Sequence, residues 1–374
     1  MDRRNFLAST GSLISASVAG CTTFTSSRDT HDKQGYEVNW AIPIEGNIQT
    51  IISNPDSIIV NTFWQMLGVD RSDGNIIWTL TVDKPSDATC YYGESIVHDS
   101  DIYAITCNRL LAADAREGKE LWSDSSLADI NGWPVINPNK DILYLPGPEL
   151  LAYQISEQAV SWKTDTYTSQ FAKEVINYGI LKPVFTDYGI FTVNTHGEVL
   201  LINEDDGEVI WRHTTYPSGD GSLTRPVLQN DNIIVGKSIN KFNHDLLFAL
   251  DPKTGNVQWE SSTPSIFAKR APSAAGNNIY FSGADNHVYA HSAITGEKTW
   301  SGRVNNDCSD CWIVSDPITA NNTVFVASKQ LVAFDAKTGR VKWRMTTNDG
   351  LPVSPIVRDS TLYFADTKLF KLSI

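Results

Sequence analysis

Eight tryptophans recur along the chain at nearly even intervals, and this repeat constrains the fold more than any other feature of the sequence. Successive members are 38 to 49 residues apart, and a period in the low forties is the length of one four-stranded propeller blade. The repeated residues are Trp40, Trp78, Trp122, Trp162, Trp211, Trp259, Trp300 and Trp343. The sequence therefore predicts a repeat architecture in which each tryptophan belongs to one blade.

The residues before each tryptophan predict a strand, a tight turn and a second strand. The clearest copies read Asp-x-Lys-Thr-Gly from Asp251 to Gly255 and from Asp335 to Gly339, and each reaches its tryptophan four residues later. Glycine supplies the positive φ that such a turn needs, and the aspartate side chain can accept backbone N–H groups within it. Tryptophan offers a large apolar area, which suits packing between neighbouring blades. These residues are therefore expected to be structural.

One copy departs from the pattern. Glycine stands four residues before the tryptophan in six of the seven internal copies, namely Gly74, Gly118, Gly207, Gly255, Gly296 and Gly339. In the third copy Gln158 takes the glycine position and Gln154 takes the aspartate position. The third blade is therefore expected to be the degenerate one.

The two ends of the repeat complete each other. Residues 351–374 contain the apolar runs of an incomplete blade without a closing tryptophan strand, whereas residues 36–42 form a tryptophan strand, around Trp40, with no blade before it. Pairing these two segments closes the ring and removes exposed sheet edges. With seven internal blades, the prediction is an all-β, eight-bladed propeller closed by its N-terminal strand.

The repeat Ala-x-Asp-x-x-Thr-Gly-x-x-x-Trp resembles that of the PQQ-like, quinoprotein-type propellers over residues 36–374. This group includes quinone-dependent alcohol dehydrogenases and also non-enzymatic, BamB-type assembly lipoproteins. The resemblance implies the fold, but it leaves the activity open because one fold supports many functions.

The first 35 residues are predicted to direct export rather than to belong to the propeller. Arg3 and Arg4, followed by Phe6 and Leu7, resemble a twin-arginine export signal, and the stretch from Val18 to Cys21 resembles a lipobox. The apolar stretch between them is too short and too rich in serine for a membrane-spanning helix. We expect a signal peptide at residues 1–20, lipidation of Cys21, a flexible tether at 21–35 and the propeller at 36–374.

Composition narrows the choice of partner. The formal net charge is −13 and no basic tract occurs, so nucleic-acid binding is not expected. The acid excess together with the export signal resembles surface lipoproteins of salt-loving archaea. The sequence thus predicts a protein outside the cytoplasm, held at the cell membrane by a lipid anchor and associated with a protein partner.

Four cysteines remain once Cys21 is assigned to the lipid. Cys90 and Cys107 fall near the first two predicted strands of the second blade, and Cys308 and Cys311 fall in the loop after Trp300. Disulfide bonds are the first expectation for an exported protein, with free thiols as the alternative. A zinc site or a redox pair is less consistent with the sequence, because no second ligand pair follows at zinc spacing.

The sequence offers no recognisable catalytic or metal motif. His287 and His291 are four residues apart, but on the predicted strand that spacing is about 13 Å, too far to share an ion. No nucleophile elbow, Walker loop, dinucleotide-binding glycine motif or zincin motif is present. No catalytic residue, metal or cofactor is predicted.

A binding site is predicted on the loops that join one blade's outer strand to the next blade's inner strand. Several of these loops end in a proline, at Pro134, Pro183, Pro226, Pro272, Pro317 and Pro355. The residues just before these prolines are expected to ring the mouth of the central channel, and they include Trp133, Lys182, Arg225, Arg270 and Asp316.

Three cations in this set come from consecutive blades. Lys182, Arg225 and Arg270 would form a surface basic arc able to hold a carboxylate, a phosphate or an acidic loop of a partner. Alternatively, these cations pair with neighbouring carboxylates. The long loops at 163–181 and 301–316, the latter carrying Trp312, are expected to widen the same face.

Three functional classes follow from this sequence. The first is a membrane-anchored, non-catalytic binding or assembly scaffold. The second is a PQQ-dependent dehydrogenase with calcium; the resemblance implies a vicinal Cys-Cys pair and calcium ligands for such enzymes, but the chain has no Cys-Cys dipeptide. The third is a carbohydrate- or polymer-binding surface protein, suggested by Trp133, Tyr167 and Trp312.

Overall fold

The computed structural model divides the chain into Met1–Lys33 and a compact unit, Gln34–Ile374. It describes residues 35–81, 92–106, 109–127, 130, 132–137, 139–165, 182–194, 197–215, 222–238, 245–264, 270–305, 313, 315–346 and 353–374. Within these ranges, no helix has the length and apolar character needed to cross a membrane. The predicted export residues Arg3, Arg4 and Cys21 lie outside the described residues, as do Cys90, Cys107, Cys308, Cys311 and Trp312.

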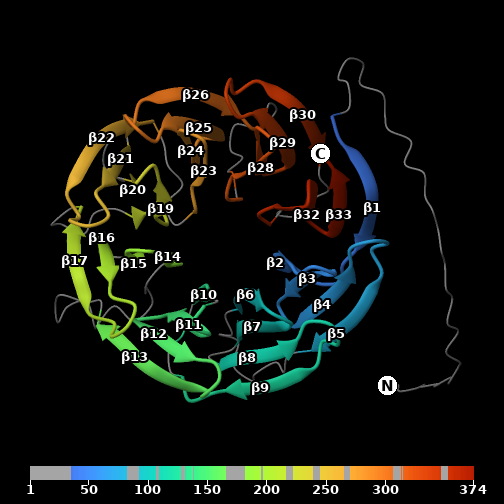
Figure 1. Ribbon diagram of the computed structural model, residues 1–374. Coiled ribbons are helices and arrows are strands. Elements are labelled where there is room, and N and C mark those ends of the chain that lie inside the picture. The colour runs from blue at the N-terminus through green and yellow to red at the C-terminus, as the bar shows by residue number, and fades with distance from the viewer. Residues whose placement is uncertain are drawn as a thin grey trace, which may run out of the picture. The chain divides into compact units, whose positions relative to one another are not determined.

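The compact unit is an eight-bladed, all-β propeller, as the sequence predicts (Figure 1). The first blade consists of β2 (Ile48–Ser53), β3 (Ser57–Thr62), β4 (Gln65–Asp70) and β5 (Ile76–Thr81). The second consists of β6 (Tyr92–His98), β7 (Asp101–Thr106), β8 (Arg109–Asp114) and β9 (Glu120–Asp124). The third consists of β10 (Val135–Asn137), β11 (Ile142–Pro146), β12 (Glu149–Gln154) and β13 (Ala159–Asp165). The fourth consists of β14 (Val184–Thr186), β15 (Gly189–Val193), β16 (Glu198–Ile202) and β17 (Val209–Thr214).

The remaining blades repeat the same antiparallel order. The fifth has an additional short strand and consists of β18 (Ser222–Leu223), β19 (Val227–Gln229), β20 (Asn232–Ser238), β21 (Asp245–Leu250) and β22 (Val257–Thr263). The sixth consists of β23 (Ser273–Ala275), β24 (Asn278–Ser282), β25 (His287–Ser292) and β26 (Lys298–Arg303). The seventh consists of β27 (Ile318–Ala320), β28 (Thr323–Ala327), β29 (Gln330–Asp335) and β30 (Val341–Thr346). The eighth consists of β31 (Ile356–Arg358), β32 (Thr361–Ala365), β33 (Lys368–Ser373) and β1 (Glu37–Pro43).

The middle strands of each blade are buried on both faces. All of β3, β15 and β16 is buried, because neighbouring blades cover each side of the sheet. Such strands read as continuous apolar runs rather than as alternating patterns. The outer strands alternate instead: in β30 the exposed Val341 and Lys342 precede the buried Trp343. The hydrophobic core is therefore a ring of separate layers between blades.

The N-terminal strand closes the ring, which confirms the prediction from the chain ends. β1 pairs antiparallel with β33, from Glu37 opposite Ser373 to Pro43 opposite Lys368, so the first and last strands lie side by side (Figure 1). Arg71 of the first blade also bonds to the eighth blade where the ring closes. Its Nη2 lies 2.9 Å from Asp359 Oδ2, and its Nε donates to the Tyr363 hydroxyl at 3.2 Å, both in the eighth blade.

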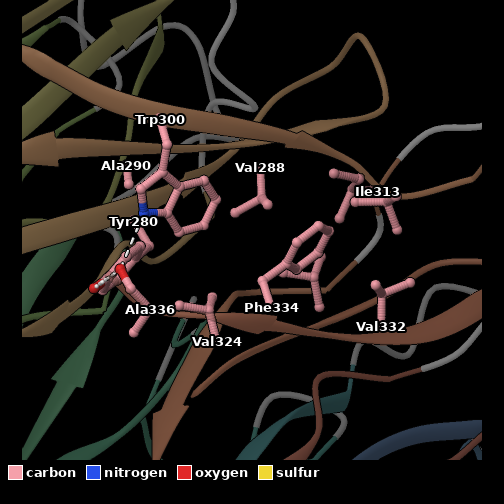
Figure 2. Packing of buried hydrophobic residues seen from close by; sticks show 11 residues of the cluster. Tyr280, Val288, Ala290, Trp300, Ile313, Val324, Val332, Phe334 and Ala336 are labelled. Carbon is pink, nitrogen blue, oxygen red and sulfur yellow. Dashed lines mark hydrogen bonds between the residues drawn. The ribbon is translucent and has the colours of Figure 1, made fainter. Parts of the chain in front are cut away.

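Each blade is joined to the next by its tryptophan. Trp300 of the sixth blade donates from Nε1 to the carbonyl oxygen of Ala336 in the seventh at 3.0 Å, and Tyr280 donates to the same oxygen at 3.0 Å (Figure 2). Figure 2 also shows Phe334 beside Trp300, and their ring centroids are 6.0 Å apart. The equivalent indole bond is found for Trp40, Trp78, Trp162, Trp211 and Trp259.

The turn glycines receive these tryptophans. Gly255 has a φ of +70°, and a Cβ built on it would lie 2.8 Å from Trp211 Cε3 of the preceding blade. The six predicted turn glycines all adopt positive φ. Gln158, in the degenerate copy, adopts a φ of 50° without being glycine. At the closure, Gly35 lies against Trp343 in place of a turn glycine. The predicted structural role of these residues is confirmed.

Candidate functional site

The inner strands converge on a cavity of about 990 Å³. Its lining includes five of the residues predicted to ring the channel mouth, namely Trp133, Lys182, Arg225, Arg270 and Asp316. All five lie one or two residues before a proline at the entry to an inner strand, so the repeat places them at the same end of their blades. We call this end of the propeller the cavity face.

Arg225 is the most buried charged residue of the cavity, with 5% of its surface exposed. Its Nη1 lies 3.4 Å from Asp316 Oδ2, and its guanidinium carbon lies 3.5 Å from the ring centroid of Trp133. Arginine stacks on aromatic faces because its planar cation is attracted to the ring's negative face. The partners come from the loops before the third and seventh blades, so Arg225 links distant parts of the ring.

Asp316 connects four consecutive blades. Its Oδ1 accepts the backbone N–H of Ala271 at 3.0 Å, and its Oδ2 faces Arg225. Its own backbone N–H donates to Ser354 Oγ at 2.9 Å. These contacts join the entries to the fifth, sixth, seventh and eighth blades. The carboxylate is thus both an ion-pair partner and a brace between blades.

Arg225 is buried rather than exposed at the channel mouth. Trp133 covers the face of its guanidinium and Asp316 pairs with it, which corresponds to the alternative of cations paired with carboxylates. Within the described part of the chain, Arg225 Nε is nevertheless buried without a hydrogen-bond acceptor. A buried donor left unpaired costs about 1–3 kcal/mol, and more when it is charged.

The described lining of the cavity is richer in cationic side chains than the protein as a whole. Lys182 and Arg270 are half-buried there, and with Arg225 they make three cationic side chains, whereas Asp316 is the one carboxylate among the described lining residues. The whole chain has a net charge of −13. Such a concave site attracts anions, because its low-dielectric walls concentrate the local field.

An aromatic pair that the repeat pattern does not predict lies beside this cavity. Phe63 and Trp64 form the turn between β3 and β4 and are 38% and 37% exposed, with ring centroids 6.3 Å apart. Phe63 also lines the cavity. Two adjacent aromatics between two predicted strands were the available signal, since turns are normally built from glycine, proline and short polar residues.

The histidines do not form a shared site. His287 begins β25 and is half-buried, whereas His291 is fully buried near its end. His291 Nδ1 lies 2.8 Å from the Gly296 carbonyl oxygen, so it carries the proton, and Nε2 is buried without a partner among the described residues. Burial lowers the pKa of His291. The neutral ring serves as a core residue of the sixth blade.

The described cavity residues do not fit the calcium that quinone enzymes use. Calcium takes six to eight oxygen ligands, with carboxylates prominent among them. Asp316 is the one carboxylate in the described lining, and its two oxygens already contact Ala271 and Arg225. Across the described ranges, no group of three or more His, Cys, Asp or Glu residues is placed to hold a metal ion.

Known proteins resemble this chain in both sequence and fold. The family model described as outer membrane protein assembly factor BamB matches residues 34–164, 195–310 and 249–373. The BamB protein of Yersinia pestis is 22% identical over 271 residues, covering 68% of this chain and 64% of that protein. This chain spans between 18% and 64% of the length of the curated relatives it matches.

Solved structures agree on the fold. BamB from Moraxella catarrhalis superposes with a TM-score of 0.68 at 17% identity, covering 91% of this chain and 98% of that one. A quinohemoprotein alcohol dehydrogenase from Pseudomonas putida HK5 superposes with a TM-score of 0.70 at 14% identity, covering 90% of this chain and 76% of the enzyme. At such identities the likeness establishes the fold alone.

Proposed function

This chain belongs to the family of the outer membrane protein assembly factor BamB, and we propose that it is a non-catalytic binding scaffold that captures a protein partner on its cavity face. The scaffold acts outside the cytoplasm and is tethered to the membrane through the lipid on Cys21.

The observation that carries this proposal is the composition of the cavity. Three cations, one engaged carboxylate and Trp133 line one concavity in a protein of strongly negative charge. Interfaces are commonly anchored by buried arginine and aromatic side chains with a polar rim around them. The arrangement supplies the groups that recognise a partner.

A second candidate rests on the exposed pair Phe63 and Trp64. Exposed aromatic rings next to a cavity can stack on sugar rings, so a surface polysaccharide is the competing ligand. The two candidates differ in their dependence on charge, because a neutral polysaccharide does not require Lys182 or Arg270. Binding that is retained when both cations are replaced would favour the polysaccharide.

Site-specific photocrosslinking in intact host membranes tests the scaffold proposal. A photoreactive amino acid is introduced at Phe63, on the cavity face, and in a matched control at Ile294, which is 55% exposed in the turn after β25 at the opposite end of its blade. The proposal predicts one discrete protein adduct from position 63 and none from position 294. Equal labelling from both positions, or no protein adduct from position 63, would contradict it.

A further inference from the structure

Arg225 has more hydrogen-bonding capacity than its described surroundings use. A guanidinium carries five N–H donors in one plane. Its described polar contact is Nη1 to Asp316 at 3.4 Å, and Trp133 covers one face of the plane. Nε is buried and has no acceptor among the described residues. A residue that lines a cavity in this state is suited to receive an oxygen acceptor from a ligand.

The wall of the cavity around Arg225 has fewer backbone N–H donors than its length would normally supply. Proline has no backbone N–H, so each proline in the wall removes one donor that could have bound an anion. The prolines that line the cavity are Pro183, Pro226, Pro272, Pro317 and Pro355. Side chains therefore supply most of the donors in this wall, and among them the buried Arg225 is a cation with an unused N–H.

The preferred oxyanion is a carboxylate with an apolar neighbour. A planar guanidinium matches a carboxylate through two parallel N–H···O bonds. Trp133 beside Arg225 provides aromatic surface for a group next to that carboxylate. The volume, about 990 Å³, lies at the upper end of small-ligand sites and far exceeds what one carboxylate group fills.

We propose that the cavity binds an acidic polypeptide segment of the partner, with a carboxylate of that segment on Arg225 and an adjacent aromatic side chain beside Trp133. This inference rests on the proposed scaffold function and specifies the chemistry of its partner. Asp316 holds the guanidinium in position before the segment arrives. The segment supplies the acceptor that Arg225 Nε lacks. Binding therefore requires the paired N–H groups of the planar guanidinium, and a positive charge alone is not sufficient.

Calorimetric titration of the full chain with two matched peptides tests this inference. The probes are Ac-Gly-Asp-Phe-Asp-Gly-NH2 and the same peptide with both Asp residues replaced by Asn. We expect the Asp peptide to bind at least tenfold more tightly, because a charge-assisted bond is replaced by a neutral one. Arg225→Lys retains the charge but loses the fork, and it should weaken the Asp peptide at least tenfold. Arg340→Lys, an exposed control, should leave its affinity unchanged.

Several outcomes would overturn the inference. Equal affinity for the Asp and Asn peptides would do so even if Arg225→Lys failed to fold, because that comparison uses the unaltered protein. Displacement of the Asp peptide by equimolar acetate or inorganic phosphate would show that the site takes a small free oxyanion. If the two peptides bind equally but the Phe63 adduct forms in membranes, only this inference fails. If the Asp peptide binds preferentially and no adduct forms, the scaffold proposal fails instead.

Discussion

Replacing Gly255 with alanine tests how the repeat holds the blades together. Gly255 adopts a φ of +70°, a region that costs an L-residue about 1–2 kcal/mol. The added Cβ would lie 2.8 Å from Cε3 and 2.9 Å from Cδ2 of Trp211. Overpacking of this kind costs about 1–3 kcal/mol. We therefore expect Gly255→Ala to lower the free energy of unfolding by about 2–5 kcal/mol.

The third blade supplies the matched control. Gln158 occupies the same turn position and already adopts a φ of 50°, so Gln158→Gly should stabilise the protein by about 1 kcal/mol or less. Urea denaturation, followed by tryptophan fluorescence, measures both variants against the unaltered protein. A Gly255→Ala midpoint within error of the unaltered protein would refute the reasoning, as would a Gln158→Gly loss as large as that of Gly255→Ala.

Three further predictions follow from particular side chains. Asp316→Asn should lower the free energy of unfolding by about 3–5 kcal/mol, because Arg225 is left buried without a counter-charge; a melting temperature equal to that of the unaltered protein would contradict this. Burial lowers the pKa of His291, so the unfolded chain takes up the proton first and the free energy of unfolding should fall as the pH drops from about 7 to about 5. His291→Phe should flatten this slope, which thermal melts at each pH can measure. The pKa values of Asp251 and Asp335 are lowered by turn hydrogen bonds to Thr254 and Thr338, so these groups titrate below that window. Cys21→Ser should release the folded protein from host membranes, whereas the double variant Arg3→Lys, Arg4→Lys should remain inside the cell. Cell fractionation measures both, and a Cys21→Ser protein that stayed membrane-bound would contradict the predicted lipid anchor.

The fold could be predicted from the sequence because its determinants are local and repeated. The turn from Asp251 to Gly255 is determined by its own residues, through the bond from Thr254 N–H to Asp251 Oδ1 and the positive φ of Gly255. Trp259 follows Gly255 at the same spacing in sequence as in the other copies. Repetition of that unit predicted the number of blades, and the incomplete ends predicted the pairing of β1 with β33. Even the exception at Gln158 kept the backbone conformation that the repeat demands.

The site was predictable only in outline. The prolines placed Trp133, Arg225 and Asp316 at one end of the propeller, and the cavity contains all three. Their pairing could not be predicted, since Arg225 and Asp316 are 91 residues apart and meet only because the ring bends. Burial could not be predicted either, so the sequence left open whether Arg225 is an accessible cation or is paired with a carboxylate. Phe63 could not be predicted from the repeat, because its turn contains none of the Asp, Gly and Trp positions that recur from blade to blade.

The yield of the Phe63 photoadduct in a charge-reversed protein tests the central claim most directly. Lys182→Glu with Arg270→Glu reverses two cavity cations and leaves the pair of Arg225 and Asp316 in place. If the cavity face captures its partner through an anionic group, the adduct should disappear from intact membranes while the melting temperature stays within a few degrees of the unaltered protein. An adduct of undiminished yield from the charge-reversed protein would contradict the account.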